Sequence, residues 1–235
     1  MKWDDLALLV GIRPFGEGDA LAHFLTFSHG LACGLIKGGQ SRRMRPFLMP
    51  GNSFDIEWKG RLAEQLGFFS AECTLQRAPR IMAAGPSDRA AAILSAACAV
   101  LCDALPQMQP NHRVFENTLL LFDDPRIDNY ALWERELLAE LGFRMALDKC
   151  NATGSCEDLV YISPKTGHAI SRGAGEPYKH LLLKMPRVWA SGFSGEGDDD
   201  DWREALRVLE FFLDSRVYSL LKKEMPWARR AICSL

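Results

Sequence analysis

The chain has no acidic residue between Ala20 and Phe54, although Asp and Glu are frequent elsewhere. An even spread of its 30 acids over 235 residues would place about four or five in that window. Inside it, the stretch Gly30–Gly51 contains four cations, which are Lys37, Arg42, Arg43 and Arg45. With no carboxylate to offset them, they create a local positive field on a chain of net charge −2. Two explanations stand: a site for a polyanion, or a solvated turn between strands.

Motifs that would indicate an enzyme are also missing. Gly38-Gly39 lacks the lysine and hydroxyl spacing of a phosphate-binding loop, and neither G-x-S-x-G nor H-E-x-x-H occurs. The five histidines are scattered. The paired acids Asp123 and Asp124 stand beside Pro125, where a helix cap or a turn explains them. We therefore expect no catalytic residues and no enzymatic activity.

Long hydrophobic runs and a disulfide framework are absent as well. No stretch of about eighteen strongly apolar residues occurs, so we expect no transmembrane helix. Asp4 and Asp5 stand where a secretory signal would carry positive charge. The seven cysteines are odd in number and irregular in spacing, which is typical of reduced thiols. These features predict a soluble cytoplasmic protein.

Five short apolar runs separated by glycine-bearing turns fill the first 80 residues. They are Leu6–Phe15, Ala20–Phe27, Leu31–Lys37, Phe54–Arg61 and Gly67–Leu75. Alternation is cleanest in the fourth run, where Phe54, Ile56 and Trp58 share one face. The pattern predicts a small closed or partly closed β-barrel, with an open sandwich as the alternative.

After residue 80 the pattern changes to helices with one interruption. Helical spacing marks an alanine-rich segment ending at Leu105 and three further segments, which are Arg113–Phe122, Asn129–Leu141 and Trp202 to about Lys222. Residues 147–175 combine glycines, a short β-rich run and turn composition, which predicts an inserted β-hairpin. The fold class is therefore α+β, with a barrel domain at residues 1–80 and a helical domain at residues 81–235.

Cys150 and Cys156 raise the question of a metal site. A structural zinc ion takes four ligands, commonly from two C-x₂₋₄-C pairs. Here five residues separate the two cysteines, and no second pair follows. His168 would supply a third ligand, which leaves the set one short. We predict no metal and no cofactor.

Three stretches, in order, resemble the RecO family of bacterial recombination mediators. The first is GLIKGGQSRRMRPFLMP (34–50), followed by Gly51, Asn52 and Trp58. The second is CNATGSCEDLVYISPKTGHAISRGAGEPY, with Gly142-Phe143 before it, and the third is the run LKMP at 183–186. The similarity extends from about Trp3 into the final helix. It implies an N-terminal OB-fold followed by a helical domain with an inserted zinc-ribbon-like β-hairpin.

The resemblance also implies a function. Family members bind single- and double-stranded DNA, anneal complementary strands, and work with RecR and the C-terminal tail of the single-strand-binding protein SSB. In this way they help to load RecA in the RecF pathway of recombinational repair. The implied location is the cytoplasm, with nucleoid association during repair and no membrane. The alternative is an OB-fold protein–protein adaptor that binds an acidic partner rather than DNA.

For the hairpin, the resemblance gives specific positions. Many family members carry four cysteines there, as two C-x-x-C pairs. Matched to this chain, those positions fall on Cys150, Thr153, Ser171 and Ala174, so three of the four ligands are absent and Cys156 lies off the pattern. We expect a metal-free hairpin held by its own packing.

The residues predicted to bind DNA are six cations of the barrel domain, namely Lys37, Arg42, Arg43, Arg45, Lys59 and Arg61. Phe47 and Trp58 are candidate stacking residues, although Trp58 shares the face that we expect in the core. The acidic, apolar tail of SSB needs an apolar groove rimmed by cations. The final helix offers Phe211, Phe212, Arg216, Tyr218 and Lys222, where ordinary core packing explains the aromatic residues equally well.

Overall fold

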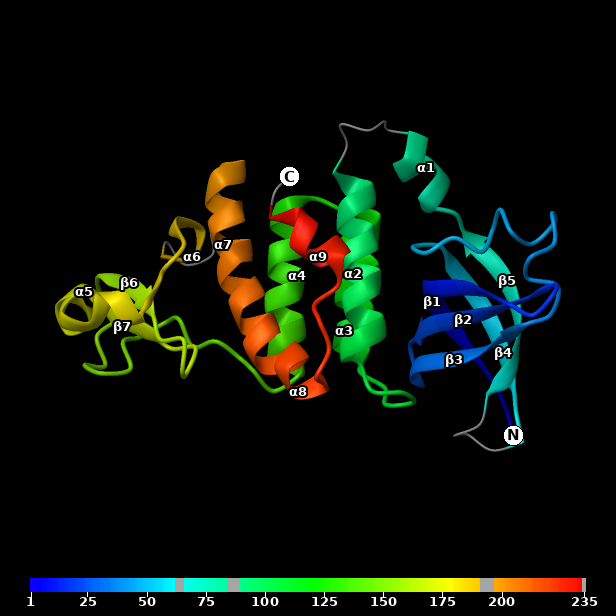
Figure 1. The fold of residues 1–235 in the computed structure, drawn as a ribbon, viewed down its shortest axis with the longest axis horizontal. Coiled ribbons are helices and arrows are strands. Elements are labelled where there is room, and N and C mark those ends of the chain that lie inside the picture. Colours follow the sequence, from blue (N-terminus) through cyan, green and yellow to red (C-terminus); the bar gives the residue numbers. More distant parts are fainter. Residues whose placement is uncertain (62–65, 84–88, 191–196, 234–235) are drawn as a thin grey trace. The chain divides into compact units, whose positions relative to one another are not determined.

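The computed structural model describes residues 1–61, 66–83, 89–190 and 197–233 (Figure 1). They form two compact units. The first joins Met1–Arg126 with Pro226–Cys233, and the second contains Ile127–Met225. The predicted domain division at residue 80 stays a prediction, because these units group elements by contact. Over the described ranges, no helix has the length and apolarity needed to cross a membrane.

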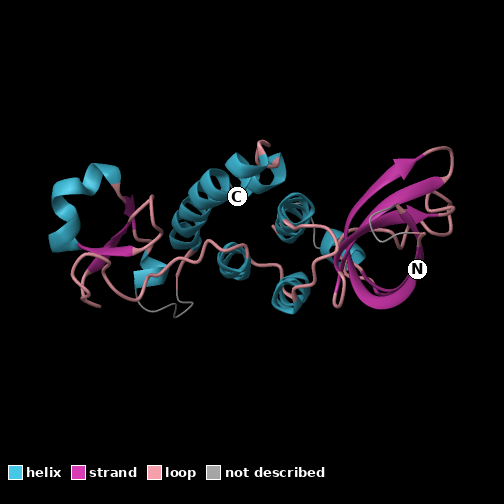
Figure 2. Ribbon diagram, turned by 90° about the horizontal axis from the view of Figure 1, so that it is seen from below, coloured by secondary structure: helices cyan, strands magenta, loops and turns pink. Residues whose placement is uncertain are grey.

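The first unit begins with a closed five-stranded barrel, whose strands are magenta in Figure 2. Its strands are β1 (Lys2–Phe15), β2 (Asp19–Thr26), β3 (Gly30–Ile36), β4 (Ser53–Lys59) and β5 (Gly67–Leu75). They follow the order β1-β2-β3-β5-β4, and the pairing of β1 with β4 closes the barrel. Only the short β3–β5 pairing is parallel. The predicted barrel is confirmed as the closed form, and the open-sandwich alternative is wrong.

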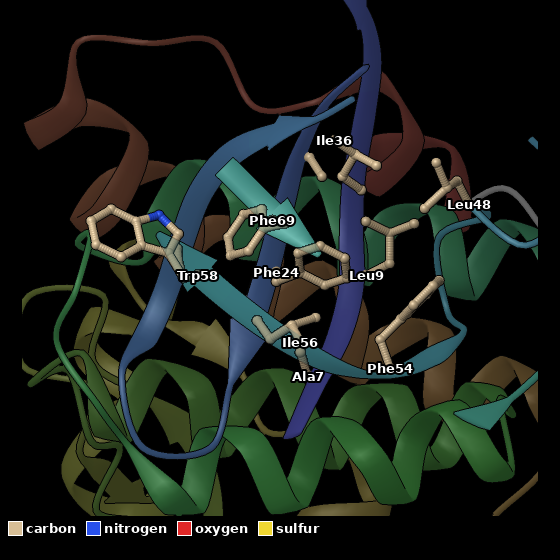
Figure 3. Packing of buried hydrophobic residues seen from close by; sticks show 11 residues of the cluster. Ala7, Leu9, Phe24, Ile36, Leu48, Phe54, Ile56, Trp58 and Phe69 are labelled. Atoms are coloured by element: carbon tan, nitrogen blue, oxygen red, sulfur yellow. The ribbon is translucent and has the colours of Figure 1, made fainter. Parts of the chain in front are cut away.

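Alternating side chains of the strands fill the barrel (Figure 3). The ring of Phe24 lies edge-on to those of Phe54 and Phe69, with centroids 5.3 and 5.0 Å apart. Trp58 is only 1% exposed in the same cluster. Its candidate role as a base-stacking residue is therefore excluded by its place in the core.

Helices of the first unit pack beside the barrel. They are α1 (Ala78–Ala83), α2 (Ala90–Ala104), α3 (His112–Asp123) and α9 (Trp227–Ile232). The run from Ala90 to Cys102 is uncharged because α2 contacts both β1 and α9 and buries most of its surface. Figure 1 shows the short helix α9 beside α2, although the sequence pattern did not predict it.

The second unit combines helices with a small sheet. Its main helices are α4 (Ile127–Glu140) and α7 (Asp199–Phe212), which contact each other. A π-helical segment, η2 (Leu213–Tyr218), and then α8 (Ser219–Leu221) continue α7. Asp198 and Asp201 form a capping box at the start of α7, where acids also favour the helix dipole.

The predicted hairpin is present as β6 (Leu159–Ile162) and β7 (Ala169–Ser171), which pair antiparallel. A third strand, β8 (Leu183–Lys184), pairs with β6 on the other side. Three short helical turns complete the unit, namely α5 (Arg172–Gly175), η1 (Glu176–Leu181) and α6 (Arg187–Ala190).

Candidate nucleic-acid interface

The segment between β3 and β4, residues 37–52, is called the arginine loop below. It is built from consecutive turns, with the amide of Arg45 donating to Ser41 O at 3.0 Å and that of Leu48 to Met44 O at 3.2 Å. Gly38 has φ +66°, a conformation that favours glycine where the chain leaves β3. The turns leave Arg42, Arg43 and Arg45 exposed to solvent.

Both ends of the arginine loop are anchored to the barrel. Gln40 donates from Nε2 to Asp19 O at 2.7 Å and from its amide to Gly18 O at 3.0 Å. Leu48 is 5% exposed and packs into the barrel core. The fully buried Asn52 donates from Nδ2 to Phe47 O at 2.8 Å. The arginines are therefore carried by a fixed scaffold.

Asn52 also connects the loop to the strand that ends beside it. Its Oδ1 accepts the backbone amides of Arg77 at 2.9 Å and Ala78 at 3.0 Å. The buried guanidinium of Arg77 in turn donates to Asp123 Oδ1 and to Ser53 Oγ, both at 2.6 Å. The buried side-chain amide of Asn52 thus connects the arginine loop, the end of β5 and the start of α1.

The six predicted cations are all exposed, and they fall into two groups. Lys37, Arg42, Arg43 and Arg45 belong to the arginine loop, and in the described part of the chain no carboxylate lies within ion-pair distance of them. Lys59 and Arg61 lie at the end of β4. Lys59 pairs with Glu57, which also pairs with Lys2, and these hydrogen bonds lower the pKa of the Glu57 carboxyl.

A cavity of about 310 Å³ opens beside the arginine loop. Arg13, Arg45 and the polar Gln40 line it, together with apolar and small residues, which are Ile12, Pro14, Ala20, Gly39 and Leu48. Sequence reasoning missed Arg13, because a single cation in a strand carries no pattern. Burial, and then the nearby Arg13, lower the pKa of His23, so that this half-buried histidine is neutral at neutral pH.

A second residue that sequence reasoning missed is Phe68 on β5, whose side chain is 44% exposed. Its neighbour Phe69 is 5% exposed and lies in the barrel core. Two adjacent aromatic residues in one strand must point to opposite faces, and that signal was available in the sequence. Lys37 Nζ lies over the Phe68 ring, 5.0 Å from its centroid. Phe47 in the arginine loop is also exposed, at 37%.

The predicted partner residues do not form one exposed groove. Phe212 and Tyr218 are 3% and 0% exposed, so they belong to the core of the second unit. Arg216 donates to the carbonyl oxygens of Pro164 and Lys165 and thereby holds the hairpin turn. Phe211 is 38% exposed, and Lys222 adopts φ +54° where α8 ends. The grouping of these five residues as a partner site is corrected: the helix turns two of its aromatic residues inward.

A different hollow in the second unit has part of the composition that the partner site needs. We call it the α4 groove; its volume is about 210 Å³, and it is lined by two arginines, two carboxylates and three apolar residues, which are Arg135, Arg144, Glu136, Asp148, Ala139, Met145 and Leu147. Arg135 forms an ion pair with Glu136 at 2.9 Å, whereas Arg144 is exposed at the rim. The groove therefore combines apolar side chains with an accessible cation.

Two of the hairpin positions matched to family cysteines, Thr153 and Ser171, lie against the sulfur atom of a third, Cys150. Ser171 donates to the Sγ of the buried Cys150 from its amide at 3.2 Å and from its hydroxyl at 3.4 Å. Burial raises the pKa of this thiol, but hydrogen bonds from Ser171 and Thr153 outweigh it and lower the pKa to about 6. Among the described residues, no three His, Cys, Asp or Glu side chains gather as metal ligands. The metal-free state of the hairpin stays a prediction.

Comparison with known proteins identifies the family. A family model described as "Recombination protein O N terminal" matches residues 1–76, and one described as "Recombination protein O C terminal" matches residues 88–225. The chain belongs to the RecO family. The DNA repair protein RecO of Rhodospirillum centenum is 41% identical over 97% of this chain and 92% of its own length. That of Methylocella silvestris is 38% identical over 98% and 94%, respectively. Membership places the chain among DNA repair and recombination proteins.

Proposed function

We propose that the chain is a non-enzymatic mediator of recombinational repair that binds single- and double-stranded DNA and anneals complementary strands. The observation that carries this proposal is the anchored arginine loop. It presents four exposed cations, and no described carboxylate lies within ion-pair distance of them. Such a cluster binds phosphates through counterion release, which is independent of base sequence.

The geometry supports annealing because contacts to phosphate leave the bases free. Cations that neutralise the backbones reduce the repulsion between two strands, while the Watson–Crick edges stay available for pairing. Arg42, Arg43 and Arg45 supply this neutralisation, and Lys37, Lys59 and Arg61 extend it along the barrel. The barrel thus holds strands without choosing their sequence, and no cofactor is required.

The partners in this proposal are RecR, the SSB tail and, indirectly, RecA, all in the cytoplasm and at the nucleoid during repair. We assign the acidic, apolar tail of SSB to the α4 groove, because Met145 and Leu147 offer apolar contact and the exposed Arg144 offers a positive charge beside the carboxylates of Glu136 and Asp148. Binding of a labelled SSB tail peptide, measured by fluorescence anisotropy, tests this assignment. Arg144→Ala is expected to weaken binding several-fold, whereas Arg207→Ala, which removes an exposed arginine of α7, is the control. If both variants bind the peptide with the same affinity, the SSB tail binds elsewhere on the protein.

Annealing of complementary strands coated with SSB tests the main proposal. The Arg42→Ala/Arg43→Ala variant is expected to anneal far more slowly than the unaltered protein. Lys165→Ala/Arg207→Ala removes two exposed cations from the second unit and is the charge-matched control. If the unaltered protein does not anneal but still binds SSB or RecR, the alternative is correct: the barrel serves a protein–protein adaptor.

A further inference from the structure

The open face of β4 and β5 carries an aromatic ring among cations at one end. Phe68 is 44% exposed there, and its partner in register on β4 is Lys59. Lys2 on β1 stands opposite Lys59, and Lys37 follows β3 on the other side of the ring. We propose that Phe68 is a stacking platform for an unpaired base of a single-stranded nucleic acid. This inference rests on the proposed function and adds to it a residue that favours single strands over duplex.

Strand alternation fixes the direction of the Phe68 ring. Phe69 and Trp58 point into the barrel core, so Phe68 and Lys59 point outward from adjacent strands. Neighbouring strands lie about 4.8 Å apart, which puts Lys59 one strand spacing from the ring. A nucleic-acid strand crossing β5 and β4 would therefore meet the ring first and a cation directly after it.

The charges along this face favour binding of a polyanion at the end where Phe68 lies. Glu57 pairs with both Lys2 and Lys59, and the exposed Asp4 stands opposite Glu57 on β1, so these two carboxylates balance the two lysines and Lys37 gives this end its excess positive charge. Further along the same strands, Asp55 and Glu72 stand opposite each other in register. A polyanion is thus attracted to the Phe68 end and repelled from the other.

Lys37 also shows how the site would accept a base. Its ammonium group lies over the Phe68 ring in an exposed cation–π contact, which is a weak interaction on a flexible side chain. A base takes over the face of the ring, and the ammonium group moves to the adjacent phosphate. Stacking on an aromatic side chain is tolerant of base identity. Bases in a duplex are already stacked on their neighbours, so they gain nothing from the ring.

Three ligands of equal length separate this role from phosphate binding: oligothymidylate, an abasic oligonucleotide and a duplex. Phe68→Leu keeps apolar bulk but removes the aromatic face. We expect it to weaken binding of oligothymidylate about tenfold and to leave the abasic strand and the duplex nearly unchanged. Arg42→Ala/Arg43→Ala is expected to weaken all three. Tyr178→Leu, a change of an exposed aromatic residue in the second unit, is the matched control.

The outcomes distinguish a failure of the proposed DNA-binding function from a failure of the stacking role of Phe68. If the unaltered protein binds none of the ligands, the proposed function is wrong and the inference falls with it. If it binds all three and Phe68→Leu loses affinity for all of them equally, or for none, only the stacking role is overturned. Ultraviolet crosslinking of the unaltered protein to oligothymidylate, mapped by mass spectrometry, gives a result that does not depend on how the variant folds. We expect an adduct at Phe68; adducts confined to other residues would overturn the inference.

Discussion

Trp58 shows how single residues set the barrel core, because the large indole ring needs glycine on both sides. A Cβ atom added at Gly60 or Gly67 would lie 2.3 Å from a Trp58 ring atom, closer than any real contact. The indole is 1% exposed and surrounded by other core side chains, so it has no room to move. The two glycines are required by this close approach.

Gly67→Ala is therefore expected to lower the free energy of unfolding by about 1–3 kcal/mol through overpacking. Urea denaturation, followed by tryptophan fluorescence, measures the change. Gly18→Ala is the control, because a Cβ atom there meets nothing within 4 Å. Equal stability of the two variants would contradict the steric account.

The thiol of Cys150 differs in its pKa from three other thiols that are buried or half-buried. Burial raises the pKa of Cys33, Cys73 and Cys98, whereas hydrogen bonds lower that of Cys150 to about 6. Because its pKa in the folded state is below that of a free thiol, the contribution to stability is complete above about pH 9 and is lost as pH falls through about 6. Ultraviolet absorbance of the thiolate should show a transition near pH 6 that Cys150→Ser abolishes. A first thiol transition above pH 8 in the unaltered protein would contradict this.

At the scale of elements, the arginine loop depends on Asn52. Asn52→Ala removes the bonds to Phe47, Arg77 and Ala78 and leaves two buried amides without an acceptor. We expect a loss of about 2–4 kcal/mol in stability and faster amide hydrogen exchange at Arg77 and Ala78. Asn111→Ala is the comparison, since it removes the cap of α3 at a cost of about 1 kcal/mol. Protection of the Arg77 and Ala78 amides as strong as in the unaltered protein would show that Asn52 does not hold this junction.

Most regular elements could be predicted from periodicity, whereas short ones could not. The five strands and four long helical segments follow from apolar spacing, because each buries one face against a core. The two-residue strand β8 exists only through its pairing with β6, and no local pattern encodes such a contact. The start of β1 at Lys2 was missed for the same reason: its alternation is mostly exposed and its pairing with β4 defines it.

For the candidate nucleic-acid interface, the sequence predicts the charge but not the three-dimensional arrangement of the residues. A run of cations without acids identifies the arginine loop, because solvent exposure of arginine needs no tertiary information. The outward direction of Phe68 could be read from its neighbour Phe69, but its contact with Lys37 and the place of Arg13 beside the arginine loop emerge only when strands are placed side by side. The assignment of Phe212 and Tyr218 failed because an amphipathic helix does not reveal which of its apolar edges faces the core.

At the scale of the whole molecule, the proposed binding to DNA has to work against net charge. The chain carries −2 overall and has a pI near 6.2, so a polyanion is attracted by a patch rather than by the molecule as a whole. With about four phosphates neutralised, the log affinity for single strands should fall with log salt at a slope near −3. Arg42→Ala/Arg43→Ala should reduce that slope by about 1.4, as fluorescence anisotropy titrations can measure. A slope near zero in the unaltered protein would contradict the phosphate site.

Helix α9 has a consequence for how the chain is made. Residues 226–233 belong to the same compact unit as the barrel, yet they are synthesised about 100 residues after Arg126. On the ribosome, the face of α2 that contacts α9 stays uncovered during that interval. The first unit therefore gains its full set of contacts only after the second unit has been translated, so a nascent chain that stalls in between carries a complete arginine loop on an incompletely packed support.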